Sequence, residues 1–260
     1  VLLSSHAVPL ETSVATATSD EQRFRLKQLD NVVEEMAIAA GLPKPKVYLV
    51  PDPDPNAFAT GRDPRHASVA VTSGLLDLLN RNQLQGVVAH ELSHIRNLDV
   101  RLLTVIAALV GAVALLSDWT LRGMRYGAFR GGRRSRDSEK GRGRGASLLV
   151  LFVLWLVAAT LAPIVGQILA MAVSRRREYL ADASGAELTR NPSVLADALD
   201  RIDEAIEPTR AIKRGSAHLC IADPLGRSMG IREGFWPDLL ATHPPMKNRI
   251  AALRQMAYGH

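Results

Sequence analysis

Apolar side chains recur with a helical period near the start of the chain and then give way to short β-prone runs. The positions from Phe24 to Met36 follow the helical period after Ser19-Asp20-Glu21-Gln22, which fits a capping box, and Gly41 ends the pattern. Three runs rich in β-forming residues come next, separated by Pro, Asp and Gly: 47–50, 56–60 and 67–72. The pattern predicts a surface helix followed by a small sheet.

A longer helix is predicted after the sheet. Asn82-Gln83-Leu84-Gln85 is a second candidate capping box, and apart from Gly86 neither Pro nor Gly interrupts the chain before Gly111. We therefore expect one helix that begins near Asn82 and continues without a break into an apolar stretch. Two later helices are predicted, separated by Asn191-Pro192: 174–188 and 193–206.

Two uncharged stretches lie in the middle of the chain, at 102–117 and 145–174. The second exceeds the roughly 20 residues that a bilayer-spanning helix requires, and we predict that it is transmembrane. The first has 16 uncharged residues, which make about 24 Å of helix against a hydrocarbon core of roughly 30 Å. It can span if Arg101 snorkels and Trp119 lies in the interface, and the alternative is a buried core helix.

Composition narrows the class of protein and the kind of metal site. The chain has 260 residues, of which 47% are hydrophobic, so it can bury a core and is not disordered as a whole. Its one cysteine, Cys220, cannot form an intrachain disulfide or a cysteine-rich metal site. We therefore expect a reducing compartment or a cytosolic catalytic face, and any metal must be bound by His and carboxylates.

The net charge of +6 comes from one segment between the two apolar stretches. Residues 117–147 contain nine Lys or Arg against three acidic residues, and the remainder of the chain is balanced at 23 against 23. Because the apolar stretches adjoin this basic loop, contact with anionic lipid headgroups is favoured over nucleic acid, and no nucleic-acid partner is expected. The alternative is a solvated linker with no binding role.

The motif that carries chemistry is Ala89-His90-Glu91-Leu92-Ser93-His94. His90 and His94 are four residues apart, so on a helix both imidazoles project from one face and can bind one Zn²⁺. Glu91 can take a proton from zinc-bound water, whose pKa falls to about 7 in such sites, and pass it to the leaving amine. The alternative is a pair of histidines that cap a buried helix, but such a string is expected by chance in only roughly one in a hundred chains of this length.

A second pair of polar side chains completes the candidate site. Glu178 and Asp182, in Arg177-Glu178-Tyr179-Leu180-Ala181-Asp182, share one helical face. Catalytic zinc sites use three protein ligands and keep a position open for water, so we expect Glu178 to be the third ligand. Asp182 is expected to hydrogen-bond a ligand histidine, His90, and to fix its tautomer. The alternative is that the two carboxylates lie on the helix surface and pair with the arginines at 175–177.

A hairpin of two membrane helices would bring these groups together. Two spans return the chain to the side that it left. His94 lies about seven residues before the first stretch and Glu178 about four after the second, which is roughly 6 to 10 Å of helix in each case. The spacing predicts that His90, His94 and Glu178 meet near the bilayer surface.

Four segments together resemble the HtpX-like membrane zinc metalloproteases, which are relatives of the CAAX prenyl proteases. The segments occur in the family's order, with hydrophobic stretches between the second and the third: Asn56-Ala57-Phe58-Ala59-Thr60-Gly61, the extended motif from Ala89 to Asp99, Arg177 to Asp182, and Thr242-His243-Pro244-Pro245-Met246-Lys247-Asn248-Arg249-Ile250. The resemblance covers most of the chain.

The resemblance implies an α+β, mainly helical fold of the gluzincin type, with a small β-sheet and an inserted hydrophobic helical hairpin. The expected parts are the N-terminal protease region 1–101, the hairpin 102–174 with its basic loop, and the C-terminal protease region 175–260. It also implies one Zn²⁺ per chain bound by His90, His94 and Glu178, with Glu91 as the general base.

The resemblance implies further roles at the substrate site. Asn56 and Ala57 would lie on the edge strand that binds an extended peptide by main-chain pairing, and the alternative for Asn56 is a turn residue after Pro55. His243 would stabilise the oxyanion, and the alternative is a structural histidine at a helix start.

The residues themselves indicate only hydrolytic zinc chemistry. The resemblance implies that the protein is a membrane-bound endopeptidase that acts on unfolded or membrane polypeptides in quality control. Two alternatives stay open, a CAAX-type processing protease and a non-catalytic zinc-binding membrane scaffold.

The family places the protein in the cell (inner) membrane as a multi-pass protein with a cytoplasmic catalytic face. The count of basic residues, nine in the loop against six near the span ends on the catalytic side, favours the opposite orientation. The sequence does not indicate the oligomeric state.

Overall fold

The computed structural model of the protein describes residues 7–130, 142–205, 221 and 244–259. The chain forms two compact units, one made of Val1–Leu102 and Val173–His260 and the other of Leu103–Ala172. The predicted basic loop at 117–147 falls partly outside the described residues, and His243 and Cys220 lie outside them. The three-part division expected from the sequence stays a prediction.

The first unit contains a small mixed sheet. Its strands are β1 (Val8–Pro9), β2 (Lys46–Val50), β3 (Ala57–Thr60) and β4 (Ser68–Thr72). They are ordered β1-β2-β4-β3, with β2 and β4 parallel and the other two pairs antiparallel, so β3 is an edge strand. The three predicted runs are confirmed as strands to within one residue at each end. Strand β1 has only two residues and gave no recognisable pattern.

Alternating side chains separate the two faces of this sheet, as the period of two requires. Val47, Val69 and Val71 belong to the main core, whereas Val50, Phe58 and Ala70 form a smaller cluster on the other face. Strand β4 lies inside the sheet and is buried on both faces, which explains why its apolar residues form a continuous run.

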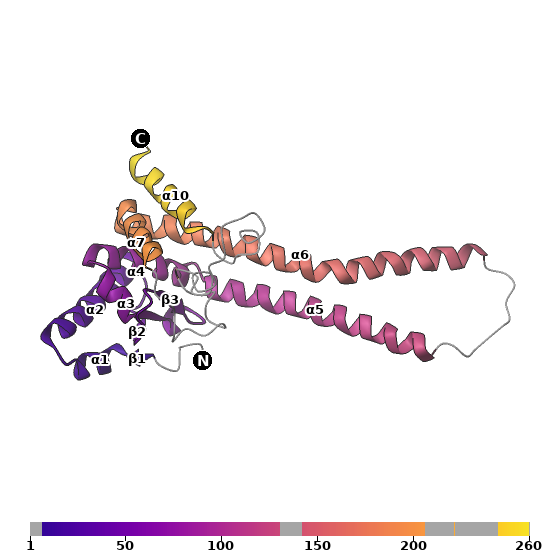
Figure 1. Ribbon diagram of the computed structural model, residues 1–260, viewed down its shortest axis with the longest axis horizontal. Helices are drawn as coiled ribbons and strands as arrows, with labels where there is room; N and C mark the ends of the chain where they lie inside the picture. Colours follow the sequence, from indigo (N-terminus) through magenta and orange to yellow (C-terminus); the bar gives the residue numbers. More distant parts are fainter. Residues whose placement is uncertain (1–6, 131–141, 206–220, 222–243, 260) are drawn as a thin grey trace. The chain divides into compact units, whose positions relative to one another are not determined.

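Helices supply the rest of this core (Figure 1). Their bounds are as follows: α1 Leu10–Thr16, α2 Asp20–Ala40, the 3₁₀ turn η1 Pro64–His66, α3 Ser73–Leu78, α4 Arg81–Arg96, α7 Pro192–Glu204 and α10 Met246–Tyr258. Helix α4 packs against α2, α7 and β3, and α10 packs against α7. The predicted α+β, mainly helical class is confirmed, including the helix α2, which Ser19 caps through the backbone N–H of Gln22 and Gly41 ends with a φ of 67°.

Two predictions about α4 are wrong. Its capping box is formed by Asn80 and Gln83, two residues before the predicted pair. The helix also does not continue into the apolar stretch, because it ends at Arg96 and a new helix, α5 (Asp99–Arg130), begins after Asn97 and Leu98. Leu98 has a φ of 57°, which a leucine rarely adopts, so neither Pro nor Gly signals this break in the sequence.

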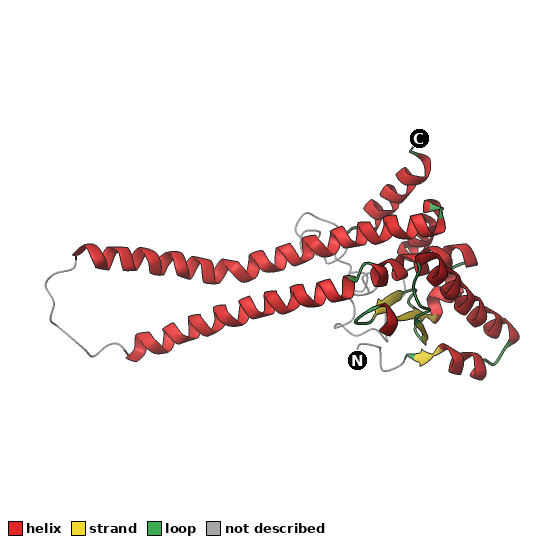
Figure 2. Cartoon of the chain, turned by 180° about the vertical axis from the view of Figure 1, so that it is seen from behind, coloured by secondary structure: helices red, strands yellow, loops and turns green. Residues whose placement is uncertain are grey.

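The second unit consists of the long parts of α5 and of α6 (Arg142–Thr189), drawn as two long helices in Figure 2. They approach each other where an added Cβ on Gly166 would lie 3.5 Å from a methyl carbon of Val110. Among the described residues, one helix is long and apolar enough to cross a membrane, at Arg101–Trp119, judged by length and composition alone. The membrane assignment of 145–174 stays a prediction, and the predicted helix at 174–188 is confirmed as the end of α6.

Helix α6 passes directly over the backbone of His90 at Gly185. A Cβ at this position would lie 3.0 Å from the His90 nitrogen and 3.2 Å from its Cα, which is tighter than ordinary van der Waals contact. Glu178 and Asp182 lie seven and three residues before Gly185, on the same face of α6. The glycine therefore lets the helix that carries these two carboxylates come close to α4.

We predict that Gly185→Val lowers the stability of the first unit. A larger side chain must push α6 away from His90, and overpacking of this kind costs about 1–3 kcal/mol. The melting temperature of the detergent-solubilised protein should fall by about 3–10 °C.

The matched control is Gly111→Val on α5, where nothing lies within 4 Å of an added Cβ. Equal melting temperatures for the two variants would contradict the role assigned to Gly185.

Candidate metal centre

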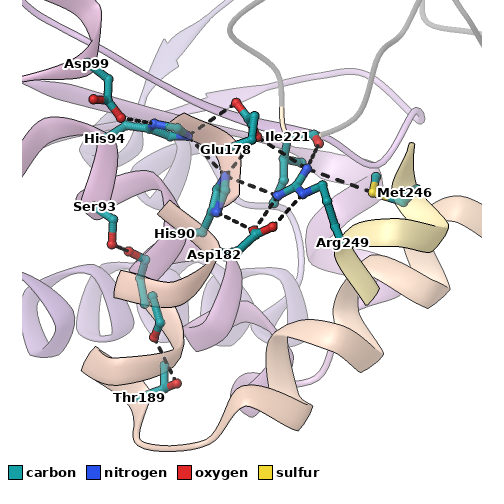
Figure 3. A network of polar contacts seen from close by, with 12 residues as sticks. His90, Ser93, His94, Asp99, Glu178, Asp182, Thr189, Ile221, Met246 and Arg249 are labelled. Carbon is teal, nitrogen blue, oxygen red and sulfur yellow. Dashed lines mark hydrogen bonds and ion pairs between the residues drawn. The ribbon is translucent and has the colours of Figure 1, made fainter. Parts of the chain in front are cut away.

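Three candidate ligands from two helices converge in the first unit (Figure 3). Helix α4 projects His90 and His94 from one face, and α6 supplies Glu178. One ligand atom from each of these residues lies within 4.8 Å of the other two. His90 and Glu178 are buried, and the His94 side chain keeps 15% of its surface exposed. The structure thus brings together the three residues that the sequence predicts as metal ligands.

A carboxylate lies next to the Nδ1 atom of each histidine. Asp182 Oδ1 lies 2.9 Å from His90 Nδ1, and Asp99 Oδ2 lies 2.7 Å from His94 Nδ1. An ionised carboxylate only accepts hydrogen bonds, so the hydrogen bond to Asp99 puts the hydrogen of His94 on Nδ1 and leaves its Nε2 a lone pair. The short distance from Asp182 to His90 Nδ1 favours the same tautomer for His90. The two Nε2 atoms face each other at 3.2 Å. Both rings therefore direct lone pairs to the same point.

The chemistry of these donors fits a divalent metal ion. Besides the two Nε2 atoms, the Glu178 carboxylate lies nearby, with one oxygen 3.7 Å from His90 Nε2 and the other 3.7 Å from His94 Nε2. The lone pairs of these three groups repel one another, and Arg249 offsets only part of this, with Nη2 3.4 Å from His90 Nε2 and Nη1 3.4 Å from Glu178 Oε2. A metal ion bound by all three groups would offset the remainder. Two imidazoles and one carboxylate are also a donor set of catalytic zinc sites that leave a position open.

Glu91 is buried next to this cluster. Only 1% of its surface is exposed, and its Oε2 has no hydrogen-bond partner among the described residues. Burial raises the pKa of the Glu91 carboxyl and the charge of Glu178 adds to this, whereas His90 and His94 act in the opposite direction. An enclosed carboxylate with an unused oxygen beside metal-binding atoms is suited to accept a proton.

Arg249 on α10 is a site residue whose role the sequence did not reveal. Its guanidinium donates two hydrogen bonds to Asp182, at 2.8 Å from Nε and 2.6 Å from Nη2, and a third from Nη1 to the Ile221 carbonyl at 3.0 Å. Nη1 also lies 3.4 Å from Glu178 Oε2. Burial alone would raise the pKa of Asp182, but the charge and hydrogen bonds of Arg249, with help from His90, lower it to about 2.

The same contacts change the pKa of Arg249. Burial favours a neutral Arg249, but Asp182 first, and then Glu178 and Glu91, outweigh this and raise its pKa above the ordinary value. Arg249 is therefore a permanent buried cation, 1% exposed, that holds Asp182 in its charged form behind His90.

The carboxylate next to His94 is also paired with an arginine. Arg177 Nη2 forms an ion pair with Asp99 Oδ1 and donates a hydrogen bond to the Asn97 carbonyl at 2.9 Å. The sequence motifs contained Asp99, Arg177 and Arg249, but nothing in their spacing indicated which partners they would meet.

The predicted substrate residues lie at the edge of the sheet. Asn56 is buried, and its Oδ1 accepts a hydrogen bond from the Ala57 backbone N–H at 3.0 Å. The Ala57 carbonyl accepts one from the Ile221 backbone N–H at 3.0 Å. Both backbone groups of Ala57 thus have partners within the chain. The oxyanion role of His243 stays a prediction, since that residue lies outside the described ranges.

Comparison with protein families agrees with the motifs. The model of Peptidase family M48 matches residues 24–257. A "Protease HtpX homolog" from Caldanaerobacter subterraneus subsp. tengcongensis is 46% identical over 245 residues, which are 94% of this chain and 76% of that protein. A protein of the same description from Lactiplantibacillus plantarum is 43% identical over 256 residues, covering 98% and 82%. The resemblance drawn from the four motifs is confirmed by these relatives.

Among solved structures, Ste24p of S. mikatae matches with a TM-score of 0.48 and 17% identity. The match covers 86% of this chain and 49% of that one.

We predict that Arg249→Ala destabilises the first unit strongly. It leaves Asp182 buried without its cation, and breaking a buried pair by removing one partner costs about 3–5 kcal/mol. Thermal unfolding in detergent with a chelator present measures this loss apart from metal binding.

Arg254→Ala provides a matched control on the same helix, since Arg254 pairs with Asp200 at 2.7 Å on the surface. An exposed pair contributes about 1 kcal/mol or less. If the two alanine variants melted alike, Arg249 would not be the buried anchor described above.

Proposed function

The chain belongs to peptidase family M48 and is a metalloprotease of the HtpX-like kind, and we propose that it is a membrane-bound zinc endopeptidase with a gluzincin-type site. Its proposed substrates are unfolded or membrane polypeptides, degraded in quality control. The observation that carries this proposal is the convergence of His90, His94 and Glu178 beside the buried carboxylate of Glu91.

One Zn²⁺ per chain would be bound by His90 Nε2, His94 Nε2 and a Glu178 oxygen. Bound there, zinc would supply Lewis-acid polarisation of the peptide carbonyl and an acidified water. Glu91 accepts the proton of the attacking water at a carboxylate oxygen and donates it to the amine that leaves. Asp182 and Arg249 hold His90 in the tautomer that presents Nε2. Since a purely structural metal site has no use for a buried proton acceptor, Glu91 favours the protease over the scaffold.

A substrate would lie along the edge strand β3 in this proposal. Asn56 and Ala57 would position an extended peptide, because the edge of a sheet offers main-chain groups for pairing. The Ala57 carbonyl already accepts the Ile221 N–H. A peptide that pairs there must therefore share this oxygen through its second lone pair or displace Ile221.

The membrane role rests on the apolar helices. Arg101–Trp119 in α5 is long enough to cross a bilayer with modest adjustment, and 145–174 in α6 is longer still. We propose that both span the inner membrane as a hairpin and that the catalytic unit lies on the cytoplasmic side.

We predict that Glu91→Gln keeps zinc and loses peptide cleavage. The amide fills the same space but cannot accept the proton, so the rate on an unfolded protein such as casein should fall at least about 100-fold. Zinc content, measured on the same sample by plasma emission spectrometry, should stay at one per chain. Equal activity in the variant and the wild type would refute the role of Glu91.

We predict in addition that Glu178→Ala loses the metal. The matched control is Glu187→Ala, an exposed glutamate on the same helix, which should retain it. Full zinc occupancy in Glu178→Ala would remove Glu178 from the ligand set.

The orientation is tested with a single new cysteine in the basic loop. In a background with Cys220 replaced, Ser138→Cys should react with a membrane-impermeant thiol reagent in intact cells, because a cytoplasmic catalytic unit puts the loop outside. Reaction only after the membrane is permeabilised would reverse the topology.

A further inference from the structure

The junction between α4 and α5 has an unusual backbone next to the candidate metal centre. Asp99 comes five residues after His94, so on a continuous helix it would lie about 140° around the axis and could not reach that ring. The chain instead breaks at Asn97 and Leu98, and Leu98 adopts the left-handed region with a φ of 57°. Such a conformation in a leucine costs about 1–2 kcal/mol and persists only where the surroundings enforce it.

The break lets Asp99 turn back toward the metal centre. Its Oδ2 lies 2.7 Å from His94 Nδ1, and its side chain is only 3% exposed. The other oxygen, Oδ1, pairs with Arg177 Nη2. The two oxygens thus have different partners, and the carboxylate has no freedom to rotate away from the histidine.

Arg177 holds the same junction by a second contact. Its Nη2 also donates to the Asn97 carbonyl at 2.9 Å, one residue before the strained Leu98. Arg177 is the residue that directly precedes Glu178 on α6. One guanidinium therefore connects the break behind His94 to the turn of helix that bears the third candidate ligand.

We propose that Asp99 and Arg177 are positioning residues that set the geometry of His94 and Glu178 relative to each other. This inference rests on the proposed zinc site. Asp99 fixes the Nδ1–H tautomer of His94 and the orientation of its ring, as carboxylates next to metal-binding histidines do. Arg177 fixes Asp99. Because Asp99 is the first residue of α5 and Arg177 lies on α6, the pair also joins the two helices that carry the apolar stretches.

The experiment measures zinc affinity of the purified full-length chain by competition with a chromophoric chelator. Asp99→Ala should weaken zinc binding about 10- to 100-fold. Asp99→Asn keeps an acceptor for Nδ1–H without the charge, so its loss should be smaller, about tenfold or less. Arg177→Gln should weaken binding in the same direction, and Arg177→Lys should restore most of it, since a single nitrogen makes both contacts of Arg177.

A spectroscopic reading separates positioning from a general structural role. In the Co²⁺-substituted protein the visible bands should shift in Asp99→Asn and Arg177→Gln and stay at the wild-type position in Arg176→Gln, an exposed neighbour on α6. Zinc affinities within twofold of wild type in both Asp99 variants, or unshifted Co²⁺ bands, would overturn the proposal. A wild-type chain that binds no zinc would instead refute the proposed function itself.

Discussion

The Nε2 atoms of His90 and His94 lie 3.2 Å apart, and each is turned toward the other by a carboxylate on the far side of its ring. Each carboxylate is in turn neutralised by an arginine, Arg249 behind His90 and Arg177 behind His94. Buried charges are expensive unless paired. The helices of the first unit are therefore arranged so that α10 and α6 deliver their arginines to the carboxylates, and the point where the lone pairs meet is left for a cation.

Close packing makes that arrangement possible. At Gly185 the backbone of α6 approaches that of α4 at His90, which places Glu178 and Asp182 on the face that looks toward both histidines. At the C-terminal end of α4, the left-handed backbone conformation of Leu98 turns the chain so that Asp99 contacts His94. The missing side chain at Gly185 and the strained backbone at Leu98 thus determine how the polar groups meet.

The three candidate ligands could be predicted from the sequence, most directly where they are local. His90 and His94 share a helical face because they are four residues apart, and Glu178 and Asp182 do so for the same reason. The meeting of Glu178 with the two histidines was also predicted, from the proposed hairpin. The contacts of the two arginines were not, because Arg249 lies 67 residues from Asp182 and Arg177 lies 80 residues from the Asn97 carbonyl. The capping box was misplaced because Asn80 and Asn82 each have a glutamine three residues later, and the helix begins after the first of them. The sheet was predictable from its apolar runs, whereas the pairing of Ile221 with Ala57 across its edge was not.

In the proposed site, one metal ion is bound by two imidazole nitrogens and one carboxylate, and zinc-edge X-ray absorption of the purified full-length protein tests this most directly. It should find one zinc per chain with nitrogen and oxygen neighbours at about 2.0–2.2 Å and the scattering pattern of two histidine rings. A shell with sulfur at about 2.3 Å, or one without imidazole rings, would contradict the proposed ligand set.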